Sequence, residues 1–173
     1  MVVAGVAGSG KSTIGRLVAD RMNCAFADGD DFHPAVNVAK MHAGIPLTDD
    51  DRWPWLRAIA AWMDERAAAG ESAVVACSVL RRAYREVLLT ARARPRMIFL
   101  VVTHDECAAR LEARHGHFFG RDLLDSQFMT LELPEPPEPV DLVLANGTPE
   151  QITDKIMALL GSGDEVSSPS GRS

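Results

Sequence analysis

The feature that most constrains this 173-residue chain is the segment 5–12, which reads GVAGSGKS and matches G-x-x-x-x-G-K-[ST]. An apolar stretch, residues 1–6, precedes it, and residues 11–22 follow with apolar side chains at helical spacing. This context predicts a strand, a glycine-rich turn and a helix N-terminus. Backbone N–H groups in such a turn point inward and form a nest for an anion. The segment therefore predicts a phosphate-binding loop.

Each residue type in the loop suits a triphosphate. Lys11 supplies a mobile cation to the β- and γ-phosphates, and Ser12 offers a hydroxyl oxygen to Mg²⁺. The residues expected to bind ATP here are Gly5, Gly8, Ser9, Gly10, Lys11, Ser12 and Thr13. The alternative is a tight strand-to-helix turn with an incidental lysine. The GTPase segments N-K-x-D and D-x-x-G are absent from the sequence, which favours a small-molecule kinase.

Short apolar runs alternate with amphipathic stretches along the chain, the signature of βαβ units and a parallel sheet. The expected strands are residues 1–6, 24–28, 73–78, 97–102 and 140–145. We predict an α/β fold of the P-loop NTPase type, with a parallel five-stranded sheet flanked by helices. A single kinase domain would span residues 1–161, with a lid segment at about 114–125. The Ser/Gly-rich residues 162–173 are expected to form a disordered tail.

Local signals place the helices. The expected helices are residues 11–22, 34–43, 54–70, 80–91, 103–115 and 148–161. Thr103 with Glu106 and Thr148 with Gln151 each match a capping box, which marks a helix start. Pro54 is a favourable residue for the first turn of a helix and is expected to open the longest one.

Composition narrows the choice of partners and compartment. The net charge is −6, so a broad nucleic-acid footprint is not expected. No uninterrupted apolar run approaches the ~20 residues of a membrane span. The cysteines are Cys24, Cys77 and Cys107, an odd number at wide spacing that suits neither a disulfide framework nor a zinc site. We expect a reduced, cytoplasmic, soluble protein in which Cys77 is a small core residue.

Two carboxylates follow the second expected strand. Asp28 and Asp30 fall where ligands bind in open α/β sheets, beyond the carboxyl ends of the strands. One of them could hold Mg²⁺ and the other could orient or deprotonate an attacking hydroxyl. An ordinary Asp/Gly turn is an equally weighted alternative. Asp105 is a rival metal ligand, although its place in the Thr103 cap favours a helix-start role.

The sequence beyond these carboxylates carries a more specific pattern. It reads DGDDFHP from residue 28, DDDRWPWL from residue 49, CSVL from residue 77 and RHGHFF from residue 114. This pattern resembles the gluconokinases of the P-loop family, which are similar in fold to shikimate and nucleoside-monophosphate kinases. The resemblance covers nearly all of residues 1–160. It implies transfer of the γ-phosphoryl group of ATP to the 6-hydroxyl of D-gluconate, giving 6-phospho-D-gluconate, with Mg²⁺.

The resemblance also implies roles for single residues. The catalytic candidates are Lys11, Asp30 and Arg114, and the metal candidates are Ser12 and Asp28. Arg110 and Arg114, one helical turn apart, would close over the phosphates as lid arginines. The acceptor carboxylate needs cationic partners. The acceptor-site candidates are Asp30, His33, Lys40, Arg52 and Arg85. Residues 146–148 would form the adenine-side loop.

Alternatives stay open at this point. The acceptor could be another small molecule such as shikimate, or the chain could be a nucleotide-binding regulator without transfer activity. His115 and His117 are better explained as lid residues than as metal ligands, because a third ligand is missing. A homodimer is compatible with the resemblance, since dimers are common among such enzymes.

Overall fold

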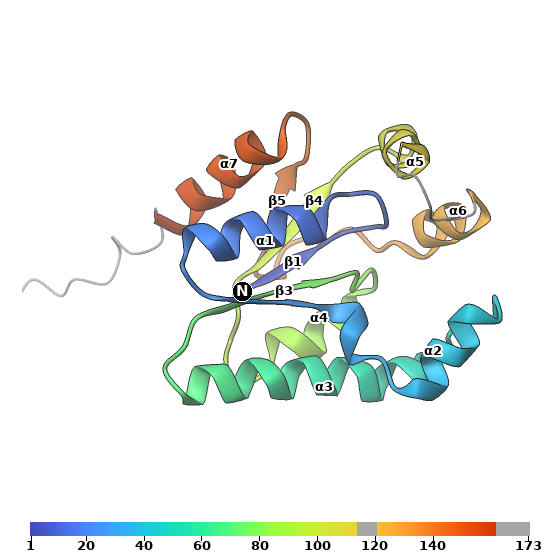
Figure 1. Ribbon diagram of the computed structural model, residues 1–173, viewed down its shortest axis with the longest axis horizontal. Helices are drawn as coiled ribbons and strands as arrows, with labels where there is room; N and C mark the ends of the chain where they lie inside the picture. Colours follow the sequence, from blue (N-terminus) through green and yellow to red (C-terminus); the bar gives the residue numbers. More distant parts are fainter. Residues whose placement is uncertain (114–120, 162–173) are drawn as a thin grey trace, which may run out of the picture.

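A computed structural model describes residues 1–113 and 121–161 of the chain. Its centre is a sheet of five parallel strands in the order β2-β3-β1-β4-β5 (Figure 1). The strands are β1 (Val2–Ala4), β2 (Ala25–Asp28), β3 (Ala73–Cys77), β4 (Met97–Val101) and β5 (Val140–Leu144). The predicted parallel five-stranded α/β fold is confirmed, and each strand lies within its expected range.

Helices connect the strands and cover both faces of the sheet (Figure 1). They are α1 (Lys11–Arg21), the 3-10 turn η1 (Gly29–Phe32), α2 (Ala35–His42), α3 (Asp49–Ala68), α4 (Arg82–Leu89), α5 (His104–Glu112), α6 (Arg121–Thr130) and α7 (Pro149–Gly161). Helices α1 and α7 lie on one face, and α3 and α4 lie on the other. Among the described residues, no helix is both long enough and apolar enough to cross a bilayer.

The two faces of β1 belong to different hydrophobic cores. Val2 and Ala4 pack toward α3 and α4, whereas Val3 between them packs toward α1 and α7. All three side chains are fully buried. The alternation follows from the two-residue period of a strand, and burial on both faces explains the continuous apolar run in the sequence.

Two predicted capping boxes are confirmed and one helix start is wrong. The side-chain and backbone groups of Thr103 and Glu106 bond reciprocally at the start of α5, as do those of Thr148 and Gln151 before α7. Helix α3 does not begin at Pro54. It begins at Asp49, where Thr48 and Asp51 form another capping box that places Pro54 inside the helix.

Helix α6 was not expected as an element of its own. The lid predicted at about 114–125 overlaps its first residues, and residues 114–120 lie outside the described part of the chain, as does the expected tail, 162–173. Helix α6 packs beside α5, near the end of the sheet where the strands terminate (Figure 1). That end gathers the loops which carry the candidate site.

Candidate active site

The phosphate loop joins β1 to α1 and presents backbone donors without a side-chain cap. Gly10 is the N-cap of α1, has φ 93° and makes no side-chain capping bond. The first-turn N–H groups therefore remain available to an anion. Gly8 has φ 77°, and a Cβ on it would lie 2.8 Å from the carbonyl oxygen of Cys107. Glycine is thus required here by both backbone conformation and space.

Ser12 and Asp28 meet beside this loop. The Ser12 hydroxyl donates to Oδ2 of Asp28 at 2.8 Å, and the other carboxylate oxygen accepts from the backbone N–H of Asp30 at 3.2 Å. Asp28 is the last residue of β2 and the N-cap of η1, so the strand end and the cap fix its position. The structure thus brings together the two metal candidates predicted from the sequence.

This donor set fits Mg²⁺. The ion prefers oxygen ligands and is commonly held by one or two protein groups together with phosphates and water. The described residues contain no group of three or more His, Cys, Asp or Glu side chains arranged to hold a metal. The rival Asp105 lies in the first turn of α5 with an exposed side chain, as a helix-start role requires.

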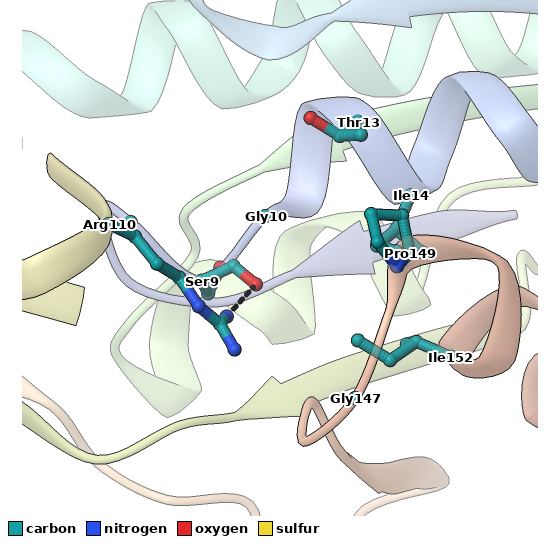
Figure 2. A pocket seen from close by; sticks show the side chains of 9 residues that line it. Ser9, Gly10, Thr13, Ile14, Arg110, Gly147, Pro149 and Ile152 are labelled. Atoms are coloured by element: carbon teal, nitrogen blue, oxygen red, sulfur yellow. Dashed lines mark hydrogen bonds between the residues drawn. The ribbon is translucent and has the colours of Figure 1, made fainter. Parts of the chain in front are cut away.

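A cavity of about 290 Å³ lies beside the phosphate loop (Figure 2). Its lining residues are Gly8, Ser9, Gly10, Thr13, Ile14, Arg110, Gly147, Pro149 and Ile152. Arg110 reaches from α5 and donates to the carbonyl oxygens of Ser9, at 3.3 Å, and Ala145, at 2.7 Å. Arg110 therefore ties α5 to the loop, and the structure brings it and Gly147 together with the predicted nucleotide residues. Arg114 lies outside the described residues.

A second cavity, of about 220 Å³, lies on the α3 side of the same sheet end. It is lined by Pro46, Leu47, Asp49, Arg52, Trp55, Ser78, Val79, Leu80, Arg81, Tyr84, Ser126, Gln127 and Thr130. Its walls come from α3, the β3–α4 loop and α6, which lie far apart in the sequence. Of the predicted acceptor residues, Arg52 lines this cavity.

Tyr84 organises the charged side of the second cavity. Its hydroxyl donates to Asp49 at 2.5 Å, and Arg81 donates to the same carboxylate at 3.1 Å. Burial, followed by the hydrogen bond to Asp49, raises the pKa of Tyr84 to about 12, so the phenol stays protonated and keeps donating. The Arg52 guanidinium lies 5.7 Å from the Tyr84 ring centroid. Asp49, Arg81 and Tyr84 were missed as site residues, although the loop after β3 is a place where ligands bind in such sheets.

Asp30 lies on η1, and His33 is the residue directly after it. His33 stacks on Trp55 with ring centroids 4.4 Å apart, and Trp55 donates to the carbonyl oxygen of Gly29 at 2.6 Å. Burial lowers the pKa of His33 and outweighs the opposing effect of Asp30. The imidazole is therefore neutral at pH 7. The side chain of Asp30 is exposed, and its own backbone N–H donates to the carboxylate of Asp28.

Arg85 does not line either cavity, so its predicted contact with an acceptor stays a prediction. Its side chain is fully buried and forms two hydrogen bonds with the Glu138 carboxylate, at 2.8 and 2.9 Å. It also donates to the carbonyl oxygens of Val79, Leu80 and Glu132. The guanidinium is committed to holding the β3–α4 loop to the chain after α6, because a buried charge needs these partners.

Lys40 is also engaged elsewhere. Its ammonium group contacts both carboxylate oxygens of Asp51, at 2.6 and 2.8 Å. This hydrogen bond, helped by the Thr48 backbone N–H, lowers the pKa of Asp51 to about 2. Lys40 does not line either cavity, so contact with an acceptor remains a prediction that requires this ion pair to open.

Cys77 is a core residue, as predicted. Its side chain is almost fully buried in the core under α3 and α4, and burial raises the pKa of its thiol to about 12. A protonated, inaccessible thiol is a poor nucleophile. The sulfur therefore contributes packing at the end of β3 rather than chemistry.

Comparisons with known proteins agree with this geometry. The shikimate kinase family matches residues 7–133. A gluconokinase of Gluconobacter oxydans is 41% identical over 91% of this chain and 88% of its own. The crystal structure of a gluconokinase from Sinorhizobium meliloti has a TM-score of 0.84 at 41% identity, covering 95% of this chain and 92% of that one. The crystal structure of a sugar kinase from Janibacter has a TM-score of 0.83 at 44% identity, covering 97% of each chain. The chain belongs to the gluconokinase family of shikimate-kinase-like P-loop kinases.

Proposed function

We propose that this kinase transfers the γ-phosphoryl group of ATP to the 6-hydroxyl of D-gluconate, giving 6-phospho-D-gluconate and ADP. The observation that carries the proposal is the 2.8 Å bond between Ser12 of the phosphate loop and Asp28, because these two proposed metal ligands then lie close to Asp30, two positions after Asp28. A phosphate site and a candidate hydroxyl-orienting carboxylate therefore share one end of the sheet. The relationship to gluconokinases supplies the choice of acceptor.

The nucleotide side works by positioning and charge neutralisation. Lys11 and the loop amides would bind the β- and γ-phosphates. Ser12 and Asp28 would hold Mg²⁺, which would neutralise negative charge of the phosphates when bound. The base and ribose would occupy the cavity next to Gly147 and Arg110. We propose that Arg114 closes over the phosphates, as its spacing from Arg110 suggests.

The acceptor side would occupy the second cavity. Within the described residues, Arg52 has no carboxylate within ion-pair distance and lines this cavity. Arg81 lies next to it, already shared with Asp49. A sugar acid offers one carboxylate and several hydroxyls, which suit this mixture of guanidinium, phenol and carboxylate groups. Asp30 would accept a hydrogen bond from the attacking hydroxyl, and His33 would contact the same end of the acceptor.

An ADP-release assay with a panel of acceptors tests the proposal. We expect release that depends on D-gluconate and exceeds the rate with shikimate or with water alone. Shikimate is the second candidate, because the shikimate kinase family matches most of the chain. Transfer to shikimate with none to gluconate would reject the proposed acceptor, and release independent of any acceptor would point to a regulator without transfer activity.

Asp30→Ala tests the carboxylate. We expect ATP binding to be retained while kcat falls about 10²–10⁴-fold, the usual contribution of a general base. Asp31→Ala is the matched control, because Asp31 is also exposed and lies next to Asp30 on η1. Equal activities for Asp30→Ala and the wild type would remove Asp30 from the mechanism.

Two further expectations belong with this function. We propose that the enzyme acts in the cytoplasm, where ATP is supplied, and that it forms a homodimer. Fractionation of cells and sedimentation of the purified protein test these expectations. A monomer at micromolar concentration would reject the dimer without affecting the transfer reaction.

A further inference from the structure

Gln127 forms a hydrogen bond with the phosphate loop. This residue lies on α6, and its Oε1 accepts a hydrogen bond from the backbone N–H of Ala7 at 2.7 Å. Ala7 belongs to the phosphate loop and is almost fully buried. A backbone N–H can bond only to the oxygen of a carboxamide, so this contact fixes which end of the Gln127 amide faces the loop.

The same side chain lines the acceptor cavity. Gln127 faces that space together with Arg52, Ser78 and Tyr84. Its Nε2 donors have no hydrogen-bond partner in the part of the chain that the structure describes, and the residue is half-buried. These donors line the cavity and are free to bond to an oxygen of a bound molecule, which would also shield them from water. Gln127 therefore has its oxygen on the phosphate loop and its nitrogen available to the acceptor.

We propose that Gln127 is a specificity-determining residue, which donates from Nε2 to a hydroxyl oxygen of the acceptor adjacent to the hydroxyl that is phosphorylated. This inference rests on the proposed function. Because the Ala7 N–H holds the amide, the acceptor's position is tied to the loop that holds the phosphates. Small errors in the separation of reacting atoms are costly in rate, so this link aligns the attacking oxygen. A polyol acid lacking that neighbouring hydroxyl would leave the donors unpaired and be rejected.

Two near-isosteric substitutions distinguish the role of the amide oxygen of Gln127 from that of its nitrogen. Gln127→Glu keeps an oxygen for the Ala7 N–H but removes the donors, whereas Gln127→Leu removes both. We expect kcat/KM for gluconate to fall roughly tenfold or more in each variant, with a smaller effect on the Kd of an ATP analogue. Met129→Leu is the control, because Met129 lies on the same helix with 87% of its surface exposed. Thermal unfolding of all four proteins checks that they fold.

A cycle with 5-deoxygluconate provides the decisive measurement. For the wild type, loss of the neighbouring hydroxyl should lower kcat/KM roughly tenfold. For Gln127→Leu, the same change in the acceptor should have almost no further effect, since the donor is already missing. Fully additive losses would overturn the inference, as would wild-type kcat/KM in both Gln127 variants or an equal loss of nucleotide affinity.

The design separates this inference from the proposed function. A wild-type enzyme that phosphorylates another hydroxy acid instead of gluconate rejects the function, and the same cycle with that acid and its deoxy analogue then decides the role of Gln127. Additive losses in that cycle overturn the role, and non-additive losses support it. Absence of transfer to every acceptor overturns both.

Discussion

The nucleotide side and the acceptor side of this site are built in different ways. The nucleotide side depends mainly on backbone groups within one short segment, with Gly8 and Gly10 in conformations that other residues rarely adopt. The cavity that we propose for the acceptor is lined mainly by side chains from α3, the β3–α4 loop and α6. A contiguous loop can therefore bind the same cofactor in many proteins. A cavity lined by side chains from several elements can bind a different acceptor after substitution of single residues.

The largest effect is expected from loss of the buried ion pair between Arg85 and Glu138, which holds the loop that lines the second cavity. Arg85→Ala should lower the free energy of unfolding by about 3–5 kcal/mol, because Glu138 would be left buried without its partner. Arg82→Ala on the same helix has an exposed side chain and should change stability by less than about 0.5 kcal/mol. Urea unfolding measures both. An Arg85→Ala protein with unchanged stability and a raised KM for gluconate would show that Arg85 acts at the acceptor site instead.

Lys11→Ala tests the nucleotide side. Loss of the cation nearest the γ-phosphate should lower kcat by about 10²–10³-fold, comparable with removal of one electrostatic stabiliser of a transition state. The effect should be the same for every acceptor, because the loop does not contact the acceptor through this residue. Single-turnover rates with saturating ATP measure it. A loss that depended on the acceptor would break the proposed division of the site into two sides.

Arg52→Gln should affect the acceptor side alone. A hydrogen bond to a charged group contributes about 1.5–3 kcal/mol, so KM for gluconate should rise roughly 10- to 100-fold while the Kd for ATP stays constant. Arg57→Gln is the control, since Arg57 is exposed on the same helix. Steady-state kinetics and calorimetry measure the two constants. Equal KM values for the two variants would mean that the acceptor carboxylate binds elsewhere.

Lys40→Met is expected to have the smallest effect on turnover. Without its lysine partner, the pKa of Asp51 should rise from about 2 toward its ordinary value, which an NMR titration measures. A lowered pKa in the folded state stabilises the protein above the unfolded pKa, and this contribution is lost as the pH falls through the folded value. Lys40→Met should therefore be less stable than the wild type at neutral pH, with the difference in stability disappearing as the pH falls toward 2, and it should keep its KM for gluconate. A tenfold rise in KM would show that Lys40 leaves Asp51 to bind the acceptor.

The same contrast explains what the sequence could predict. The phosphate loop and the five strands are encoded by local patterns, so they could be predicted from adjacent residues. The metal roles of Ser12 and Asp28, which lie 16 positions apart, came from the loop motif and from the family resemblance. The buried ion pair of Arg85 could not be predicted, because its partner Glu138 is distant in sequence and no local pattern indicates that the pair is buried. Pro54 was taken as a helix start because proline favours the first turn, whereas the stronger Thr48–Asp51 capping box begins the helix earlier.

Gln127 illustrates the remaining gap. Its side chain reaches Ala7 across 120 positions in sequence, and a lone glutamine on a helix gives no signal of that contact. Arg81 could have been found, since it follows β3 at the end of the sheet where ligands bind. Contacts between elements that are distant in sequence could therefore be identified only in the folded structure.

Identification of the phosphorylated product tests the central claim most directly. The purified enzyme should convert equimolar ATP and D-gluconate into equal amounts of ADP and a phosphate ester at the 6-position, as seen by ³¹P–¹H correlation spectroscopy. Formation of ADP without an ester, or of an ester on another acceptor while gluconate remains unchanged, would contradict the account.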